Sequence, residues 1–78
     1  MIVIYTQDIT IIHKNADVAK QDIISIYGDK LGMEAYKAVK AGPAGTAFRR
    51  HGGPLITVVS SEKAEWIRNK EKSIGMLE

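Results

Sequence analysis

Cysteine is absent from this 78-residue chain, and histidine occurs only twice. Without cysteine the chain forms neither a disulfide nor a thiolate metal site, and nothing marks it as secreted. A zinc site would need ligands beyond His13 and His51, which lie far apart in the sequence. We therefore expect no bound metal and no cofactor.

Long apolar runs are also missing, since none approaches the roughly 20 residues that span a bilayer. The apolar residues 1–5 are few and have no basic flank, which makes them a poor signal peptide. A cytoplasmic protein without a membrane partner is therefore the expectation. A single domain of this size buries roughly 60% of the surface that its unfolded chain exposes. A deep cavity would be demanding for so modest a core, so no small-molecule substrate is expected, and a homodimer would enlarge the core.

Catalytic motifs are missing as well. No Ser–His–acid set lies in a recognisable motif, and the glycines of residues 42–45 and 52–53 form neither a P-loop nor a dinucleotide fingerprint. Asp8, Asp17 and Asp22 are scattered along the chain and are equally good caps or turn formers. The sequence thus predicts a protein that is not an enzyme.

Regular apolar spacing predicts an α+β domain with the order β-β-α-α-β-β-α. Residues 2–6 and 9–13 are rich in β-branched side chains and predict a hairpin. Helical spacing begins near residue 16, where Asn15 or Asp17 can cap the first turn, and Gly28 is placed to close the helix. A second helix follows, which Asp29 can cap.

The second helix has an apolar side formed by Leu31, Ala35, Tyr36 and Val39, and Gly42 with Pro43 ends it. Small residues at Gly28 and Gly32 fit the turn of a helix-turn-helix in two different phasings. The sequence leaves open whether residues 16–41 form one kinked helix or a true helix-turn-helix.

The remaining residues predict a second hairpin, from 46–51 and 55–60, and a last helix that Ser60 or Ser61 caps. Ala64, Ile67 and Trp66 are expected to face the core, and the tail from residue 73 is expected to fray unless its apolar residues dock on a neighbour. The single domain divides into an N-terminal hairpin (1–14), a helical pair (15–42), a basic hairpin (46–60) and a C-terminal helix (61–73).

Positive charge is undiluted only in the second hairpin. Residues 42–60 contain Arg49 and Arg50 and no acid, in a chain whose net charge is only +2. Such a segment favours an anionic partner, although two arginines at a turn can also be a plain solvated tip. On a helical wheel, the free side of the preceding helix holds Glu34, Lys37, Ala38 and Ala41, with Lys40 at its margin.

At these residues the chain resembles small phage-type regulators of the Cro and excisionase kinds and the related MerR-like winged helices. Residues 35–42 look like a recognition helix with its terminating glycine. Residues 48–53 and 61–67 look like a wing followed by a helix with an acidic start and a buried tryptophan. The N-terminal hairpin is not part of the excisionase pattern. The resemblance implies a helix-turn-helix with a β-hairpin wing, the helix in the major groove and the wing on the DNA backbone.

The sequence therefore predicts a small regulator or excisionase-like accessory protein that binds double-stranded DNA as a homodimer. Its predicted contact residues are Glu34, Lys37, Ala38, Lys40, Arg49, Arg50 and His51. The alternative is a protein-interaction module, such as an inhibitor of a host enzyme, without affinity for nucleic acid. In that case residues 2–13 would add a strand to a partner or to a second copy.

Overall fold

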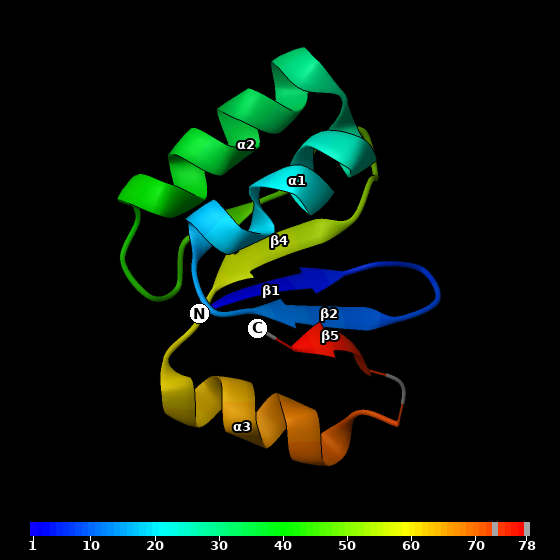
Figure 1. Cartoon of the computed structure of the whole chain (residues 1–78), viewed down its shortest axis with the longest axis vertical. Helices are drawn as coiled ribbons and strands as arrows, with labels where there is room; N and C mark the ends of the chain where they lie inside the picture. Colours follow the sequence, from blue (N-terminus) through cyan, green and yellow to red (C-terminus); the bar gives the residue numbers. More distant parts are fainter. Residues whose placement is uncertain (73, 78) are drawn as a thin grey trace.

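The computed structural model describes residues 1–72 and 74–77, which form a five-stranded sheet between helices (Figure 1). Helices α1 (Ala16–Tyr27) and α2 (Asp29–Ala41) cover one face of the sheet, and α3 (Ser61–Lys70) covers the other. The predicted α+β class and the predicted order β-β-α-α-β-β-α are confirmed. One further strand, β5 (Ile74–Leu77), follows the last helix.

The predicted N-terminal hairpin forms the centre of the sheet. Strand β1 (Ile2–Tyr5) pairs with β2 (Thr10–His13) on one side and with β4 (Leu55–Val58) on the other. The order of strands is β3-β4-β1-β2-β5, so β2 is in turn covered by β5. Both edges of β1 and of β2 are thus occupied within the chain, whereas β3 and β5 are the outer strands of the sheet. The expected addition of residues 2–13 to a partner's sheet is therefore wrong.

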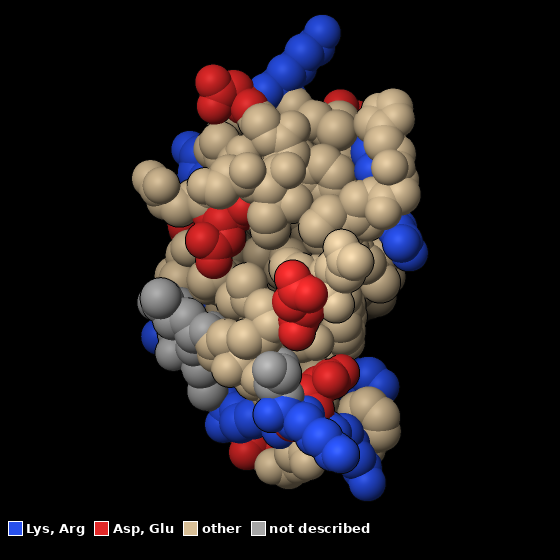
Figure 2. Space-filling view, turned by 90° about the vertical axis from the view of Figure 1, so that its right-hand side faces the viewer, with Lys and Arg blue, Asp and Glu red and all other residues tan. Residues whose placement is uncertain are grey.

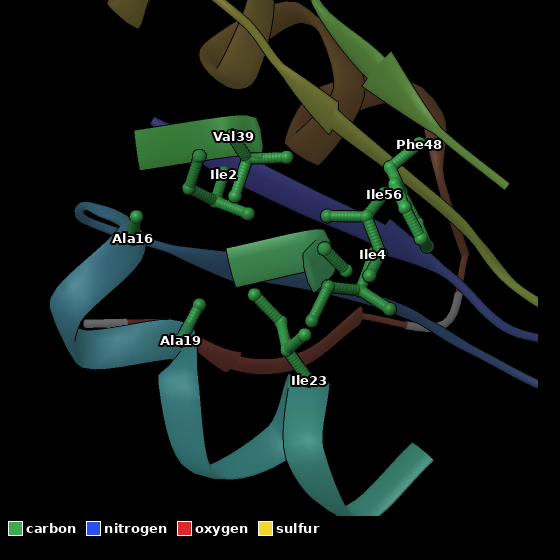
Figure 3. Packing of buried hydrophobic residues seen from close by; sticks show 9 residues of the cluster. Ile2, Ile4, Ala16, Ala19, Ile23, Val39, Phe48 and Ile56 are labelled. Carbon is green, nitrogen blue, oxygen red and sulfur yellow. The ribbon is translucent and has the colours of Figure 1, made fainter. Parts of the chain in front are cut away.

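Alternation along β1 supplies two separate cores. Ile2 and Ile4 point to the helical pair, where they pack with Ile23, Phe48 and Ile56 (Figure 3). Val3 points to the opposite face and packs with Ile12, Ala64 and Ile67 beneath α3. Successive side chains of a strand face opposite sides, so one β-branched run fills both cores. Ile4 and Val3 are each 0% exposed.

Gly28 separates the two helices of the pair. Its φ of +86° and ψ of 172° lie in a region that only glycine adopts readily, and its N–H donates to the Ile24 carbonyl. Asn15 is the residue that caps α1, because its Oδ1 accepts from the N–H of Val18 at 2.9 Å. The expected cap by Asp29 is wrong: Asp29 is the first residue of α2, which has no side-chain cap.

The helices α1 and α2 run antiparallel. Gly32, early in α2, lies against Ile24, late in α1, whereas Lys40, late in α2, binds Asp17, early in α1. A Cβ on Gly32 would stand 2.7 Å from the Ile24 Cα, so the close approach of the helices depends on this glycine. Residues 16–41 are thus two helices packed lengthwise. They are neither one kinked helix nor the expected helix-turn-helix, whose two helices cross at about 90–120°.

The second hairpin is shorter than expected. Strand β3 (Ala47–Phe48) has two residues rather than the predicted six, and residues 49–54 connect it to β4. Ser60 caps α3, with its Oγ accepting from the N–H of Lys63 at 3.2 Å. The predicted burial of Trp66 is wrong, because its side chain is 54% exposed. Trp66 lies two residues beyond the buried Ala64, about 200° around the helix and hence on its outer side.

The tail does not fray over residues 74–77. These residues form β5, which runs parallel to β2 with Thr10 beside Ile74. Ile74 packs against the core beneath α3, and β5 covers an edge of β2 that would otherwise present unpaired backbone groups. The helix ends at Lys70 rather than at residue 73, which lies outside the described residues.

Candidate nucleic-acid interface

The basic segment forms a tight turn at the end of the sheet, and we call residues 49–54 the arginine turn. The N–H of Gly53 donates to the carbonyl of Arg50 at 2.9 Å. The two residues between them, His51 and Gly52, have φ angles of +55° and +69°. Positive φ at both central positions is the requirement of a type I′ turn, which joins antiparallel strands without splaying them.

Tyr27, the last residue of α1, holds the arginine turn from the side of the helical pair. Its hydroxyl donates to the carbonyl of Pro54 at 2.6 Å and accepts from the N–H of Arg50 at 3.3 Å. Its ring packs edge-on against Phe48, with 5.5 Å between the ring centroids. The Tyr27 side chain is half-buried. The role of the hydroxyl was missed, because no local pattern relates Tyr27 to residues 50–54.

The two arginines of the turn serve opposite faces of the sheet. Arg50 lies toward the helical pair, with its guanidinium carbon 4.5 Å from the Phe48 ring centroid and Nη2 3.9 Å from Glu34 Oε1. Arg49 lines a pocket together with Tyr5, whose ring packs on the α3 side. The predicted pair of phosphate contacts is therefore divided between two surfaces.

The predicted free face of α2 is confirmed. Its exposed residues are Glu34, Lys37, Ala38, Lys40 and Ala41, whereas Ala35 and Val39 are buried in the core. Lys37 makes no ion pair within residues 1–72 and 74–77. Its ammonium group is thus available to an external anion. Glu34, one turn earlier, has the guanidinium of Arg50 beside it.

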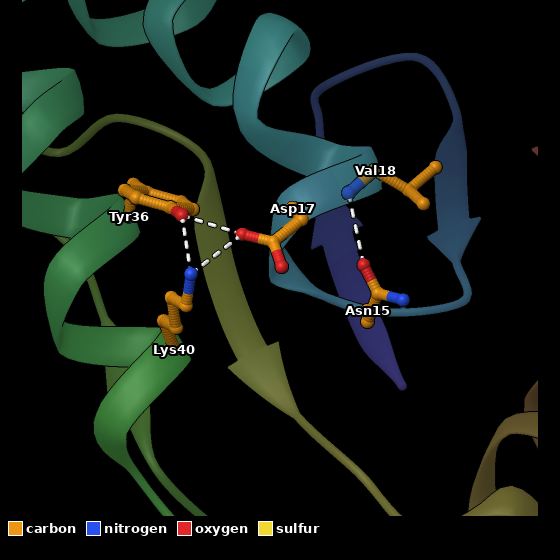
Figure 4. Close-up of polar contacts among 5 residues, drawn as sticks. All are labelled: Asn15, Asp17, Val18, Tyr36 and Lys40. Atoms are coloured by element: carbon orange, nitrogen blue, oxygen red, sulfur yellow. Dashed lines mark hydrogen bonds and ion pairs between the residues drawn. The ribbon is translucent and has the colours of Figure 1, made fainter.

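Lys40 is bound within the helical pair instead. Its Nζ donates to Asp17 Oδ1 and to the Tyr36 hydroxyl, each at 2.9 Å, and the Tyr36 hydroxyl donates to the same carboxylate oxygen (Figure 4). The hydrogen bond from Tyr36 and then that from Lys40 lower the pKa of Asp17. The pKa of Lys40 is raised by its hydrogen bond to Tyr36 and then by that to Asp17. Asp17 and Tyr27 are about 15 Å apart along α1, so Lys40 lies far from the arginine turn.

The two histidines have unlike surroundings. His51 is exposed at the tip of the arginine turn. His13 is 3% exposed, and its Nε2 lies 2.7 Å from Asp22 Oδ2. Among the described residues, no three His, Cys, Asp or Glu side chains come together in a way that could hold a metal ion.

Over the same residues, no helix has the length and apolar character needed to cross a membrane.

Comparison with protein-family models, with curated proteins and with solved structures found no match to this chain. The likeness to phage-type regulators is therefore a likeness of short motifs, and functional inference depends on the surfaces themselves.

Proposed function

We propose that this protein binds double-stranded DNA through the exposed face of α2 and the Arg50 side of the arginine turn. The contact between Arg50 and Glu34, at 3.9 Å, is the observation that carries the proposal. It brings the arginine turn beside the free face of α2, although the two segments are separate in the sequence. Glu34 alone would repel phosphate, and the neighbouring guanidinium offsets this repulsion.

The chemistry of this surface suits a nucleic-acid backbone. Lys37 and Arg50 supply cationic donors for phosphate oxygens, and His51 at the turn tip adds a further polar group. Ala38 and Ala41 are small, which allows α2 to approach the base edges of a major groove closely. Because Tyr27 fixes the turn and Phe48 supports the Arg50 guanidinium, little ordering is needed on binding.

Two predicted contact residues are left out of the proposed contact set. Arg49 lines a pocket with Tyr5 on the α3 side of the sheet, and Lys40, although exposed on α2, is engaged with Asp17. The narrower role of regulator or excisionase-like accessory protein depends on the motif resemblance. A homodimer would present two such surfaces to one duplex and would multiply a weak single contact.

Fluorescence anisotropy with a mixed-sequence duplex at two salt concentrations tests the proposal. We expect binding that weakens as salt rises, since phosphate contacts release counterions. The variant Arg50→Gln combined with Lys37→Gln should bind at least about tenfold more weakly. Arg49→Gln is the matched control and should bind like the unchanged protein. Absence of binding at low salt, or an equal loss in the control, would contradict the proposal.

A protein-interaction role is the second candidate, and Trp66 favours it. This side chain projects from the outer side of α3, with the Lys63 ammonium 4.2 Å from the ring centroid. Lys and Arg side chains gather at the α3 end of the face shown in Figure 2. Exposed tryptophan is enriched among residues that dominate protein–protein binding. A partner captured from nuclease-treated lysate and lost with Trp66→Ala, together with no DNA affinity, would favour this role.

A further inference from the structure

A pocket of about 570 Å³ opens between the β1–β2 turn and the arginine turn. Ligand pockets typically have volumes of about 300–1,000 Å³. Its lining comes from the two turns and the strand ends next to them: Tyr5, Thr6, Gln7, Arg49, Gly52, Gly53, Pro54 and Leu55. Tyr5 and Leu55 are directly paired across β1 and β4, so their side chains share the α3 side of the sheet. The pocket is thus a different surface from the one proposed for DNA.

Arg49 gives the pocket a positive charge that no carboxylate of residues 1–72 and 74–77 neutralises. Its Nε donates to the carbonyl of Gly53 at 2.9 Å, which fixes the direction of the guanidinium. In the part of the chain that the structure describes, its two terminal amino groups meet no carboxylate within 4.0 Å. None of the lining residues is acidic. A guanidinium held in this way presents a planar pair of donors that matches a carboxylate or a phosphate.

The remainder of the lining supplies further donors and an apolar wall. Burial raises the pKa of Tyr5, and the negative charge of Glu71 raises it further, so this hydroxyl remains protonated and can donate. Gln7 adds a side-chain amide at the rim. The ring of Tyr5, Pro54 and Leu55 form the apolar part. A Cβ placed on Gly52 would meet nothing within 4 Å, so there is open space beside the backbone there.

We propose that this pocket binds a small organic anion, with its carboxylate or phosphate group on Arg49 and its apolar body against Tyr5 and Leu55. The proposal departs from the expectation, drawn from size alone, that the chain takes no small molecule. It does not depend on DNA binding, because Arg49 lies outside the DNA surface and Arg50 lies outside the pocket.

Titration of ¹⁵N-labelled protein with benzoate, with phenyl phosphate and with neutral benzamide, followed by NMR, tests this inference. We expect saturable shifts of the Arg49 Nε–H and of the backbone amides of Gly52 and Gly53 with at least one of the two anions. Benzamide should cause none. The anion whose shifts saturate shows whether the pocket prefers a carboxylate or a phosphate group.

Variants give the test its specificity. Arg49→Gln should weaken anion binding at least about tenfold, whereas Arg50→Gln should leave it unchanged. Glu71→Gln removes the carboxylate whose negative charge acts on Tyr5, and it should tighten anion binding about twofold. Preserved dispersion of the amide spectrum checks that each variant is folded. The variant Arg49→Lys retains the positive charge but removes the planar guanidinium with its paired N–H donors. No saturation by either anion, equal shifts with benzamide, or full binding by Arg49→Gln would overturn the proposal.

Discussion

Two adjacent arginines work on different faces of one sheet. Arg50 lies on the side of the helical pair, over Phe48 and beside Glu34, whereas Arg49 lies on the α3 side, in a pocket with Tyr5. Both arginines lie beyond the end of β3 at Phe48, so their separation comes from their own contacts in the arginine turn rather than from strand pleating. By charge along the sequence, the two arginines look like one basic patch. In the structure, Arg50 lies on the exposed surface next to α2, whereas Arg49 lines the pocket.

The largest expected effect concerns the core that supports the Arg50 side. Ile4 is 0% exposed at the centre of the sheet, and Ile4→Ala leaves a cavity between the sheet and the helical pair. We expect a loss of about 3 kcal/mol in the free energy of unfolding. Trp66→Ala, on the outer side of α3, should change it by less than about 0.5 kcal/mol. Urea unfolding followed by circular dichroism measures both, and equal losses would contradict the assignment of Trp66 to the surface.

Tyr27→Phe removes the hydroxyl that holds both arms of the arginine turn but keeps the ring against Phe48. We expect a loss of about 1 kcal/mol in stability, as is typical for lost side-chain hydrogen bonds. Amide hydrogen exchange should become faster at Arg50 and Gly53, the residues of the turn. Because one clamp organises both sides, DNA binding and anion binding should weaken together. If only one of them weakens, Tyr27 does not link the two surfaces.

The smallest expected effect is on the cluster that binds Lys40. Hydrogen bonds lower the pKa of Asp17 from its ordinary value of 3.8, so their contribution to stability is present above that pH and is lost as the pH falls through the lowered pKa. Tyr36→Phe should shift the titration of Asp17 upward, since the Tyr36 hydrogen bond is the larger cause. Lys37→Gln is the control and should leave it in place. Carboxyl ¹³C NMR measures the midpoint, and an unchanged midpoint in Tyr36→Phe would contradict the contact.

Local features of the sequence predicted much of this fold. β-branched runs predicted the strands, and Gly28 and Gly42 predicted helix ends. The sequence placed the helix starts at Asn15 or Asp17 and at Ser60 or Ser61, and the structure has Asn15 and Ser60 as the caps. Each of these signals acts within a few residues, so each can be evaluated from the sequence alone. The free face of α2 followed from helical spacing in the same way, because Ala35 and Val39 define the buried side.

Features that depend on distant segments could not be predicted in this way. β1 is central only because β4 and β2 both pair with it, and β5 is ordered only because β2 offers an edge. Trp66 is an apolar residue whose outward position depends on how α3 docks. The separation of Arg49 from Arg50 had no local signal, because both lie in the connection after β3 rather than within a strand. Nor did the contact of Arg50 with Glu34 or the pocket that Arg49 and Tyr5 share.

One experiment measures whether Arg49 and Arg50 belong to different binding surfaces. The Nε–H resonances of Arg49 and Arg50 can be followed by ¹⁵N NMR during titration with a short duplex at low salt. We predict that the Arg50 resonance shifts progressively and saturates, whereas the Arg49 resonance stays in place. A shift of Arg49 equal to or larger than that of Arg50, or no shift of either, would contradict the account.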